Sequence, residues 1–161
     1  KRDLDLTILR SLVNDENENR ISISSLSFVD KKRVRELKNT PCDKLYRIKI
    51  SLIPSISKEK LKKGATALTG TVVEQRTPNR VSHRRADLIR KRGIRNVEVI
   101  DVSNDYAVLE IRAEHGTYIK ELVSGDEGRT QPNFSELVDS QCKVERLDVV
   151  QLYLQEIEVE K

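Results

Sequence analysis

The stretch VEVIDVSNDYAVLEIRAE, residues Val97 to Glu114, indicates the kind of sheet on which this protein is built. It contains two runs rich in β-branched and apolar residues, separated by the polar residues Ser103, Asn104 and Asp105. A short polar turn between two such runs is typical of a β-hairpin. We therefore expect two neighbouring strands that pair in antiparallel fashion.

Alternation of apolar and polar residues predicts further strands on both sides of this hairpin. These strands are expected at residues 21–29, at 44–53, from Gly70 onward with an interruption at a Thr-Pro-Asn turn, and at 143–154. The strand at 44–53 places four apolar side chains on one face, those of Tyr46, Ile48, Ile50 and Leu52. Strands therefore outnumber helices in the expected fold.

Four short helices are expected between these strands. Residues 4–13 carry apolar side chains at helical intervals. Asp30, Ser57 and Ser135 are expected to cap three more helices, over residues 30–39, 57–64 and 135–142. Gly64 is expected to end the helix that Ser57 begins. This pattern predicts the α+β class, with a mixed, largely antiparallel sheet flanked by short helices.

The composition is that of a soluble globular protein and argues against several classes of function. With 37% hydrophobic and 35% charged residues, the 161-residue chain has room for one domain, or for a large part of a bigger one, and no apolar run is long enough to span a membrane. The two cysteines, Cys42 and Cys142, and the two histidines, His83 and His115, show no metal-binding or disulfide spacing. No GxGxxG, Walker or GxSxG motif is present. We expect a cytoplasmic protein without metal or cofactor.

Positive charge is concentrated in one part of the chain. The whole sequence carries a net charge of +4, whereas residues 76–95 contain eight basic residues and one acidic residue. A cationic stretch on a nearly neutral body is typical of nucleic-acid binding, and a solvated charged surface is the alternative. The candidate RNA-binding residues are Arg76, Arg80, His83, Arg84, Arg85, Arg90, Lys91 and Arg92. For His83, an ordinary polar histidine is an equal alternative.

Four motifs together point to a known family. They are QRTPNRVSHRRAD at residues 75–87, GTYIKEL at 116–122, GDEGRTQPN at 125–133 and LDV at 147–149. Over residues 1–154 the chain resembles pseudouridine synthases, specifically the archaeal and eukaryotic tRNA-modifying family that acts on the TΨC arm. The resemblance implies a pseudouridine-synthase-like fold, tRNA as the partner, and cofactor-free isomerisation of uridine to pseudouridine in the TΨC loop. It also favours an archaeal origin.

The resemblance further implies roles for individual residues. Lys120, in GTYIKEL, matches the basic residue that pairs with the catalytic aspartate and holds that carboxylate ionised and oriented. Tyr46, in KLYRIKI, matches the tyrosine that stacks on the target base, and Leu137 is the candidate for an apolar residue lining the pocket. Tyr118 is expected to fix the turn before Lys120 by packing. The alternatives are core-edge positions for the tyrosines and a solvated surface charge for Lys120.

The nucleophile of this family, an aspartate in a Gly-Arg-Glu-Asp-like motif, has no counterpart in the sequence. The sequence also contains no methionine, not even at its first position. We therefore expect residues 1–161 to be the C-terminal portion of a catalytic domain, inactive alone, with the aspartate and any accessory RNA-binding domain in a part that this chain lacks. Two alternatives stay open: a split subunit whose partner chain supplies the aspartate, and a non-catalytic RNA-binding module.

Overall fold

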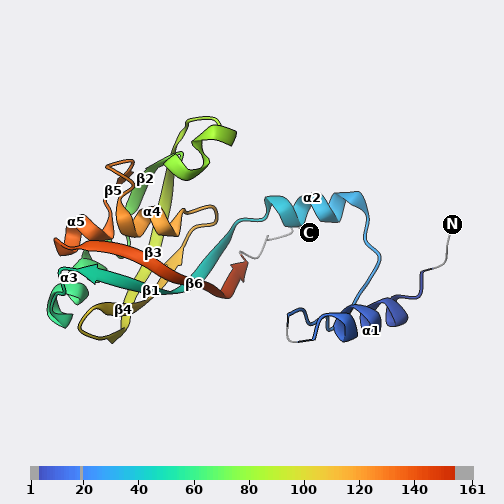
Figure 1. Cartoon of the computed structure of the whole chain (residues 1–161). Coiled ribbons are helices and arrows are strands. Elements are labelled where there is room, and N and C mark those ends of the chain that lie inside the picture. Colours follow the sequence, from blue (N-terminus) through green and yellow to red (C-terminus); the bar gives the residue numbers. More distant parts are fainter. Residues whose placement is uncertain (1–3, 19, 155–161) are drawn as a thin grey trace. The chain divides into compact units, whose positions relative to one another are not determined.

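The computed structural model describes residues 4–18 and 20–154 (Figure 1). The chain divides into two compact units, Lys1–Thr40 and Pro41–Lys161. No helix among the described residues is long and apolar enough to cross a membrane. The second unit contains every described strand and all the predicted site residues.

The described part of the first unit contains two helices, each of which begins at an aspartate. α1 (Leu6–Glu16) is capped by Asp5, whose carboxylate accepts hydrogen bonds from the backbone N–H groups of Thr7 and Ile8. α2 (Lys31–Asn39) is capped by Asp30 in the same way. Both confirm helices predicted from the sequence, although α1 begins and ends later than its apolar pattern predicts.

The strand predicted at residues 21–29 is wrong. The segment has no regular secondary structure, and a side chain holds its backbone instead. Nδ2 of Asn14 donates to the carbonyl oxygen of Ile23 at 3.1 Å, and Oδ1 of Asn14 accepts from the Ile23 N–H at 2.7 Å. The apolar side chains of the segment are not buried, and Phe28 is 76% exposed. Alternation alone does not make a strand where the described chain offers no partner strand.

The second unit is built on a six-stranded sheet in which every described strand pair is antiparallel. The strands are β1 (Cys42–Ile53), β2 (Val72–Arg76), β3 (Ile89–Val102), β4 (Tyr106–Ala113), β5 (Thr130–Gln131) and β6 (Gln141–Leu154), in the order β5-β2-β3-β4-β1-β6. The predicted hairpin is confirmed as β3 and β4. Because β3 begins earlier than predicted, Arg90, Lys91 and Arg92 lie on a strand.

One face of this sheet carries the hydrophobic core. The four β1 side chains predicted to share a face are buried in it: Tyr46, Ile48, Ile50 and Leu52. In the register of the sheet, Ile48 lies opposite Leu109 of β4. Three helices, α3 (Lys58–Leu68), α4 (Ile119–Ser124) and α5 (Phe134–Val138), add buried apolar side chains to the same core. The predicted α+β class, a sheet flanked by short helices, is confirmed.

Gly64 lies inside α3 and does not end it, which corrects the prediction from the sequence. Ser57 caps the helix as predicted, but the helix continues to Leu68. A Cβ added to Gly64 would lie only 2.3 Å from Cγ1 of Val138 on α5. The absence of a side chain therefore allows α3 and α5 to approach closely, and this glycine serves packing rather than helix termination.

The cap of α5 also differs from the prediction. The helix is capped by Asn133, whose Oδ1 accepts from the N–H of Glu136 at 3.0 Å. The hydroxyl of Ser135 instead donates to the carbonyl oxygen of Val123 at 2.8 Å and accepts from the N–H of Cys142 at 3.0 Å. Ser135 thus joins α5 to its neighbours, and a residue two positions earlier takes the capping role.

Candidate functional site

The motif GTYIKEL forms a tight turn and the beginning of α4. Gly116 has a φ of +80°, a left-handed conformation that favours glycine. A Cβ at this position would also lie 3.4 Å from Nη2 of Arg92. The hydroxyl of Thr117 donates to the carbonyl oxygen of Glu114 at 2.6 Å and closes the turn. The chain therefore enters α4 in a defined direction.

Lys120 lies in the first turn of α4, with its side chain exposed. The opposite side of the helix is anchored in the core, because Ile119, Leu122 and Val123 are buried. Within the described part of the chain, Lys120 forms no ion pair with a carboxylate. The fold thus presents a cation at the surface from a well-anchored helix.

Two hydrogen bonds from Gln75 hold the backbone at the start of α4. Gln75 lies on β2, and its side chain is fully buried. Its Nε2 donates to the carbonyl oxygen of Tyr118 at 3.0 Å, and its Oε1 accepts from the Tyr118 N–H at 2.8 Å. A buried amide that satisfies both backbone groups of one residue restricts the position of that residue. Tyr118 immediately precedes α4, so Gln75 fixes the start of the helix that carries Lys120.

An ion pair next to Lys120 joins α4 to the basic stretch. Glu121 is buried, and Arg80 donates from Nε to its Oε1 at 2.6 Å. This hydrogen bond to Glu121 raises the pKa of Arg80. The Arg80 guanidinium also lies 5.9 Å from the centre of the Tyr118 ring. Because Arg80 belongs to the short 3-10 helix η1 (Asn79–Arg84), the pair ties η1 to α4.

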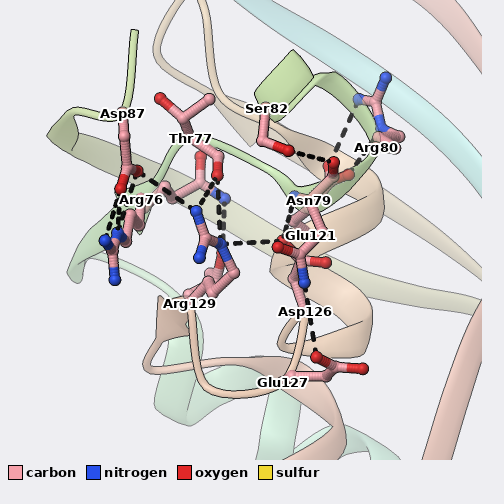
Figure 2. Close-up of polar contacts among 12 residues, drawn as sticks. Arg76, Thr77, Asn79, Arg80, Ser82, Asp87, Glu121, Asp126, Glu127 and Arg129 are labelled. Carbon is pink, nitrogen blue, oxygen red and sulfur yellow. Dashed lines mark hydrogen bonds and ion pairs between the residues drawn. The ribbon is translucent and has the colours of Figure 1, made fainter. Parts of the chain in front are cut away.

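Further polar contacts fasten the segment around η1 to the turn that follows α4 (Figure 2). Nη2 of Arg129 donates to the carbonyl oxygen of Thr77 at 2.7 Å and to Oδ1 of Asp87 at 3.2 Å. The N–H of Asn79 donates to Oδ2 of Asp126 at 3.0 Å. The motifs QRTPNRVSHRRAD and GDEGRTQPN, which are separate in the sequence, therefore form one polar network.

Most of the predicted RNA-binding residues have polar partners inside the protein. Arg76 pairs with Asp87, and their hydrogen bonds raise the pKa of Arg76 and lower the pKa of Asp87. The remaining ion pairs join Arg80 to Glu121, Lys91 to Glu74 at 3.3 Å and Arg92 to Glu114 at 3.5 Å. Arg90 donates to the hydroxyl of Thr77 at 3.1 Å. Much of the charge of the basic stretch is therefore balanced locally.

His83, Arg84 and Arg85, which we call the η1 tip, are different. All three are exposed, and none pairs with an acidic side chain among residues 4–18 and 20–154. The segment that carries them extends beyond the end of β2 (Figure 1). The η1 tip is thus where the basic stretch presents unbalanced positive charge to solvent.

Tyr46 and Leu137, the other predicted catalytic residues, lie in different environments. Tyr46 is 8% exposed and belongs to the core that also contains Ile119 and Leu122 of α4; burial raises the pKa of its phenol. Leu137 is 37% exposed on α5, a helix that contacts α4. Tyr46 thus lies in the same core as the buried residues of α4, whereas Leu137 lies at the surface of a helix next to α4.

Gln75 and Glu121 hold the start of α4, although no sequence pattern assigns a role to either residue. Gln75 belongs to the motif QRTPNRVSHRRAD and Glu121 to GTYIKEL. A signal for Gln75 exists: in β2 it alternates in step with the buried Val73, so a polar side chain must face the core and find a partner there. Glu121 lies between the exposed Lys120 and the buried Leu122, so the sequence gives no comparable signal for it.

A polar cleft of about 430 Å³ lies beside the network of Figure 2. It is lined by Glu74, Arg76, Asn79, Ile89, Glu127, Gly128, Arg129 and Gln131. In the described part of the chain, no group of three or more His, Cys, Asp and Glu side chains is arranged to bind a metal ion. The cleft thus combines the guanidinium groups of Arg76 and Arg129 with the carboxylates of Glu74 and Glu127, so its lining is polar and of mixed charge.

Relatives of this chain carry one common name. The sequence model of the family described as Pus10, C-terminal, matches residues 2–153. The chain is 43% identical over 150 residues to tRNA pseudouridine synthase Pus10 of Methanothrix thermoacetophila, covering 93% of this chain and 33% of the relative. It is 41% identical over 150 residues to the protein of the same name from Archaeoglobus fulgidus, covering 93% and 41%. The chain thus spans between a third and about two fifths of the length of these relatives.

Solved structures of low sequence identity share the fold. A chain of a Cbf5-Nop10-Gar1 complex superimposes with a TM-score of 0.61 at 18% identity, covering 78% of this chain and 36% of that chain. A chain of an H/ACA RNP bound to a substrate RNA containing 2'-deoxyuridine gives a TM-score of 0.52 at 15% identity, covering 71% and 30%. At these identities the likeness concerns the fold alone, and it agrees with the expected fold class. Because the family match extends over nearly the whole sequence, this chain belongs to the Pus10 C-terminal family.

Proposed function

We propose that this chain forms the C-terminal part of the catalytic domain of a tRNA pseudouridine synthase that acts on the TΨC loop. In the proposed reaction, the carboxylate of an aspartate from outside this chain attacks C1′ of the ribose and forms an ester, while the bond between C1′ and N1 breaks and its electron pair stays on the base. The base rotates, and C5 attacks C1′ and displaces the carboxylate, which is thereby regenerated. The proton on C5 is lost to solvent, and N1 gains one. The product is an isomer of uridine, so no cofactor is consumed. The names of the relatives support this proposal.

The observation that carries the proposal is the way the fold presents Lys120. The side chain is exposed at the start of α4, while Gln75, the Arg80–Glu121 pair and the core hold the helix. A cation held in this way is suited to pair with a carboxylate supplied by the rest of the enzyme, and to keep it ionised and oriented for attack. Tyr46, from the core, and Leu137, from α5, are the proposed residues at the target base.

The η1 tip is the proposed site of the first phosphate contacts to tRNA. Unpaired arginines bind phosphates without reading the base sequence, which suits recognition of a folded RNA by its shape. The other candidates in the basic stretch already have partners in the protein. Arg76, Lys91 and Arg92 form ion pairs, and Arg90 donates a hydrogen bond to Thr77. Their proposed role is to shape this surface and to add weaker contacts.

Replacing both arginines of the η1 tip, Arg84→Ala with Arg85→Ala, is expected to weaken tRNA binding and to flatten its salt dependence. If each arginine neutralises one phosphate, the slope of log K against log salt falls in magnitude by about 1.4 to 1.8. The measurement is a titration of tRNA at several salt concentrations. The control is Lys62→Ala with Lys63→Ala, which removes the same charge from the exposed side of α3. Equal slopes for both double variants would contradict the assignment of the tip.

The activity itself is tested with the full-length enzyme and an unmodified tRNA transcript. Pseudouridine is detected after chemical labelling, as a stop in reverse transcription at the modified position. The expected result is pseudouridine at one or more uridines of the TΨC loop, and none in a transcript whose TΨC-loop uridines are replaced. Tight tRNA binding without any pseudouridine would contradict the proposal and would leave an RNA-binding module as the function.

A further inference from the structure

The orientation of Lys120 depends on contacts outside its own helix. α4 has only six residues, and a helix of this length is not stable by itself. The core holds one face of α4, and Gln75 holds the residue that precedes it. The third contact is the ion pair between Arg80 and Glu121. The proposed reaction assigns no role to this pair.

Glu121 follows Lys120 directly in the chain and carries a buried charge. Its side chain is 6% exposed, and its carboxylate accepts from Nε of Arg80 at 2.6 Å and from Nη2 at 3.5 Å. Without Arg80 this buried carboxylate would have no cation to balance it within the described residues, which is strongly unfavourable. Turning Glu121 toward water would relieve the penalty. Because Lys120 and Glu121 share one stretch of backbone, that movement would displace Lys120.

Arg80 approaches Glu121 from a braced segment. The residue before it, Asn79, donates its N–H to Asp126 at 3.0 Å, in the turn that follows α4 (Figure 2). Arg129 of the same turn binds the carbonyl oxygen of Thr77 at 2.7 Å. The segment that carries Arg80 is therefore tied at two points to the turn that follows α4. A positioning contact requires this kind of support from its surroundings.

We propose that the ion pair between Arg80 and Glu121 positions Lys120 for its role at the catalytic carboxylate, so that Arg80 is a positioning residue and not an RNA contact. The inference rests on the proposed function. It also separates two arginines of one short helix: Arg80, paired with Glu121, acts on the conversion step, whereas the unpaired Arg84 acts on tRNA binding. Proximity in sequence therefore does not imply a shared role in the basic stretch.

The test measures conversion and binding separately in the full-length enzyme. Arg80→Ala is expected to lower the single-turnover rate constant at saturating tRNA by about ten- to a hundredfold, the effect of a displacement of about 1 Å, and to change the Kd for tRNA by less than about threefold. The matched control is Arg146→Ala, which removes an exposed ion pair with Asp148 at 2.8 Å and should change neither quantity. A weaker tRNA affinity with an unchanged rate constant would overturn the inference.

Two further variants distinguish positioning from general damage to the fold. Combining Arg80→Ala with Glu121→Gln removes the uncompensated charge, so the double variant is expected to convert tRNA faster than Arg80→Ala alone. Arg80→Lys keeps the charge and is expected to retain most of the rate. Melting temperatures are measured in parallel. If Arg80→Ala does not fold, the rate constants of the double variant and of Arg80→Lys are compared with that of the unchanged enzyme. A double variant no faster than Arg80→Ala, together with an inactive Arg80→Lys, would count against a positioning ion pair.

Lys120→Ala separates this inference from the proposed function on which it rests. If Lys120→Ala converts tRNA at the normal rate, the proposed site is wrong. If Lys120→Ala abolishes conversion while Arg80→Ala and Glu121→Gln convert normally, the site stands and only the positioning role is wrong.

Discussion

Lys120→Ala in the full-length enzyme is expected to lower turnover by on the order of a hundredfold or more, while the affinity for tRNA changes by no more than a few fold. Without the cation, the nucleophilic carboxylate loses the ion pair that keeps it charged and aligned. The loss of this ion pair raises the free energy of the transition state and leaves the contacts between the protein and the tRNA phosphates unchanged. Lys120 is exposed and has no acidic partner in the described part of the chain, so its removal should leave the fold intact. The measurement is kcat together with the Kd for tRNA.

Two variants control this prediction. Lys63→Ala removes an exposed lysine from α3 and is expected to leave turnover unchanged. Lys120→Arg keeps the positive charge but replaces a compact ammonium by a planar guanidinium, so partial recovery is expected. Turnover and affinity that fall together in Lys120→Ala would identify Lys120 as an RNA contact and would remove it from the active site.

Phe134→Ala is expected to lower the free energy of unfolding by about 3–5 kcal/mol, because it opens a cavity in the core. Phe134 is fully buried at the start of α5. Its Cε2 lies 3.5 Å from the position that a Cβ of Gly64 would occupy, so the ring fills the contact between α5 and α3. The measurement is urea unfolding followed by circular dichroism, with the midpoint and the slope compared with those of the unchanged protein.

Leu137→Ala is the matched control on the same helix. Leu137 lies three residues from Phe134 but is 37% exposed. Its replacement is therefore expected to lower the free energy of unfolding by less than about 1 kcal/mol. A large loss at Leu137, or a small one at Phe134, would show that α5 does not pack as described. The same variant also tests the proposed role of Leu137 at the base, since lower turnover without lower stability would support a place in the pocket.

Patterns of short range predicted much of the fold. Alternation in KLYRIKISLI correctly places Tyr46, Ile48, Ile50 and Leu52 on one buried face, because side chains of a strand alternate between its two sides. The hairpin around Asn104 is correct for a similar reason, since a polar turn between two β-rich runs leaves few other local arrangements. The same kind of pattern is wrong at residues 21–29, where Asn14 binds the backbone and no described strand pairs with it.

Gly64 and Ser135 show that one residue type can indicate more than one structural role. A glycine after a run of helical residues is typical of a helix end, but Gly64 lies where α3 meets Val138 of α5. A serine before an apolar run is typical of a cap, but Ser135 binds Val123 and Cys142 instead. In both cases a partner distant in the sequence decides the role of the residue.

By itself, the sequence determined the α+β class, the buried face of β1 and the motifs that resemble pseudouridine synthases. Each of these depends on residues that are close together in the chain. Only the tertiary structure decided which residues of the basic stretch pair with acidic side chains. Arg80 and Glu121 are 41 positions apart, and folding brings them within 2.6 Å of each other beside Lys120. The strength of an ion pair depends on the distance between the two charges and on their burial, and neither can be derived from the order of residues alone. For that reason a basic stretch that looks uniform in the sequence separates, once folded, into residues that pair with acidic side chains and residues that have no acidic partner in the described part of the chain.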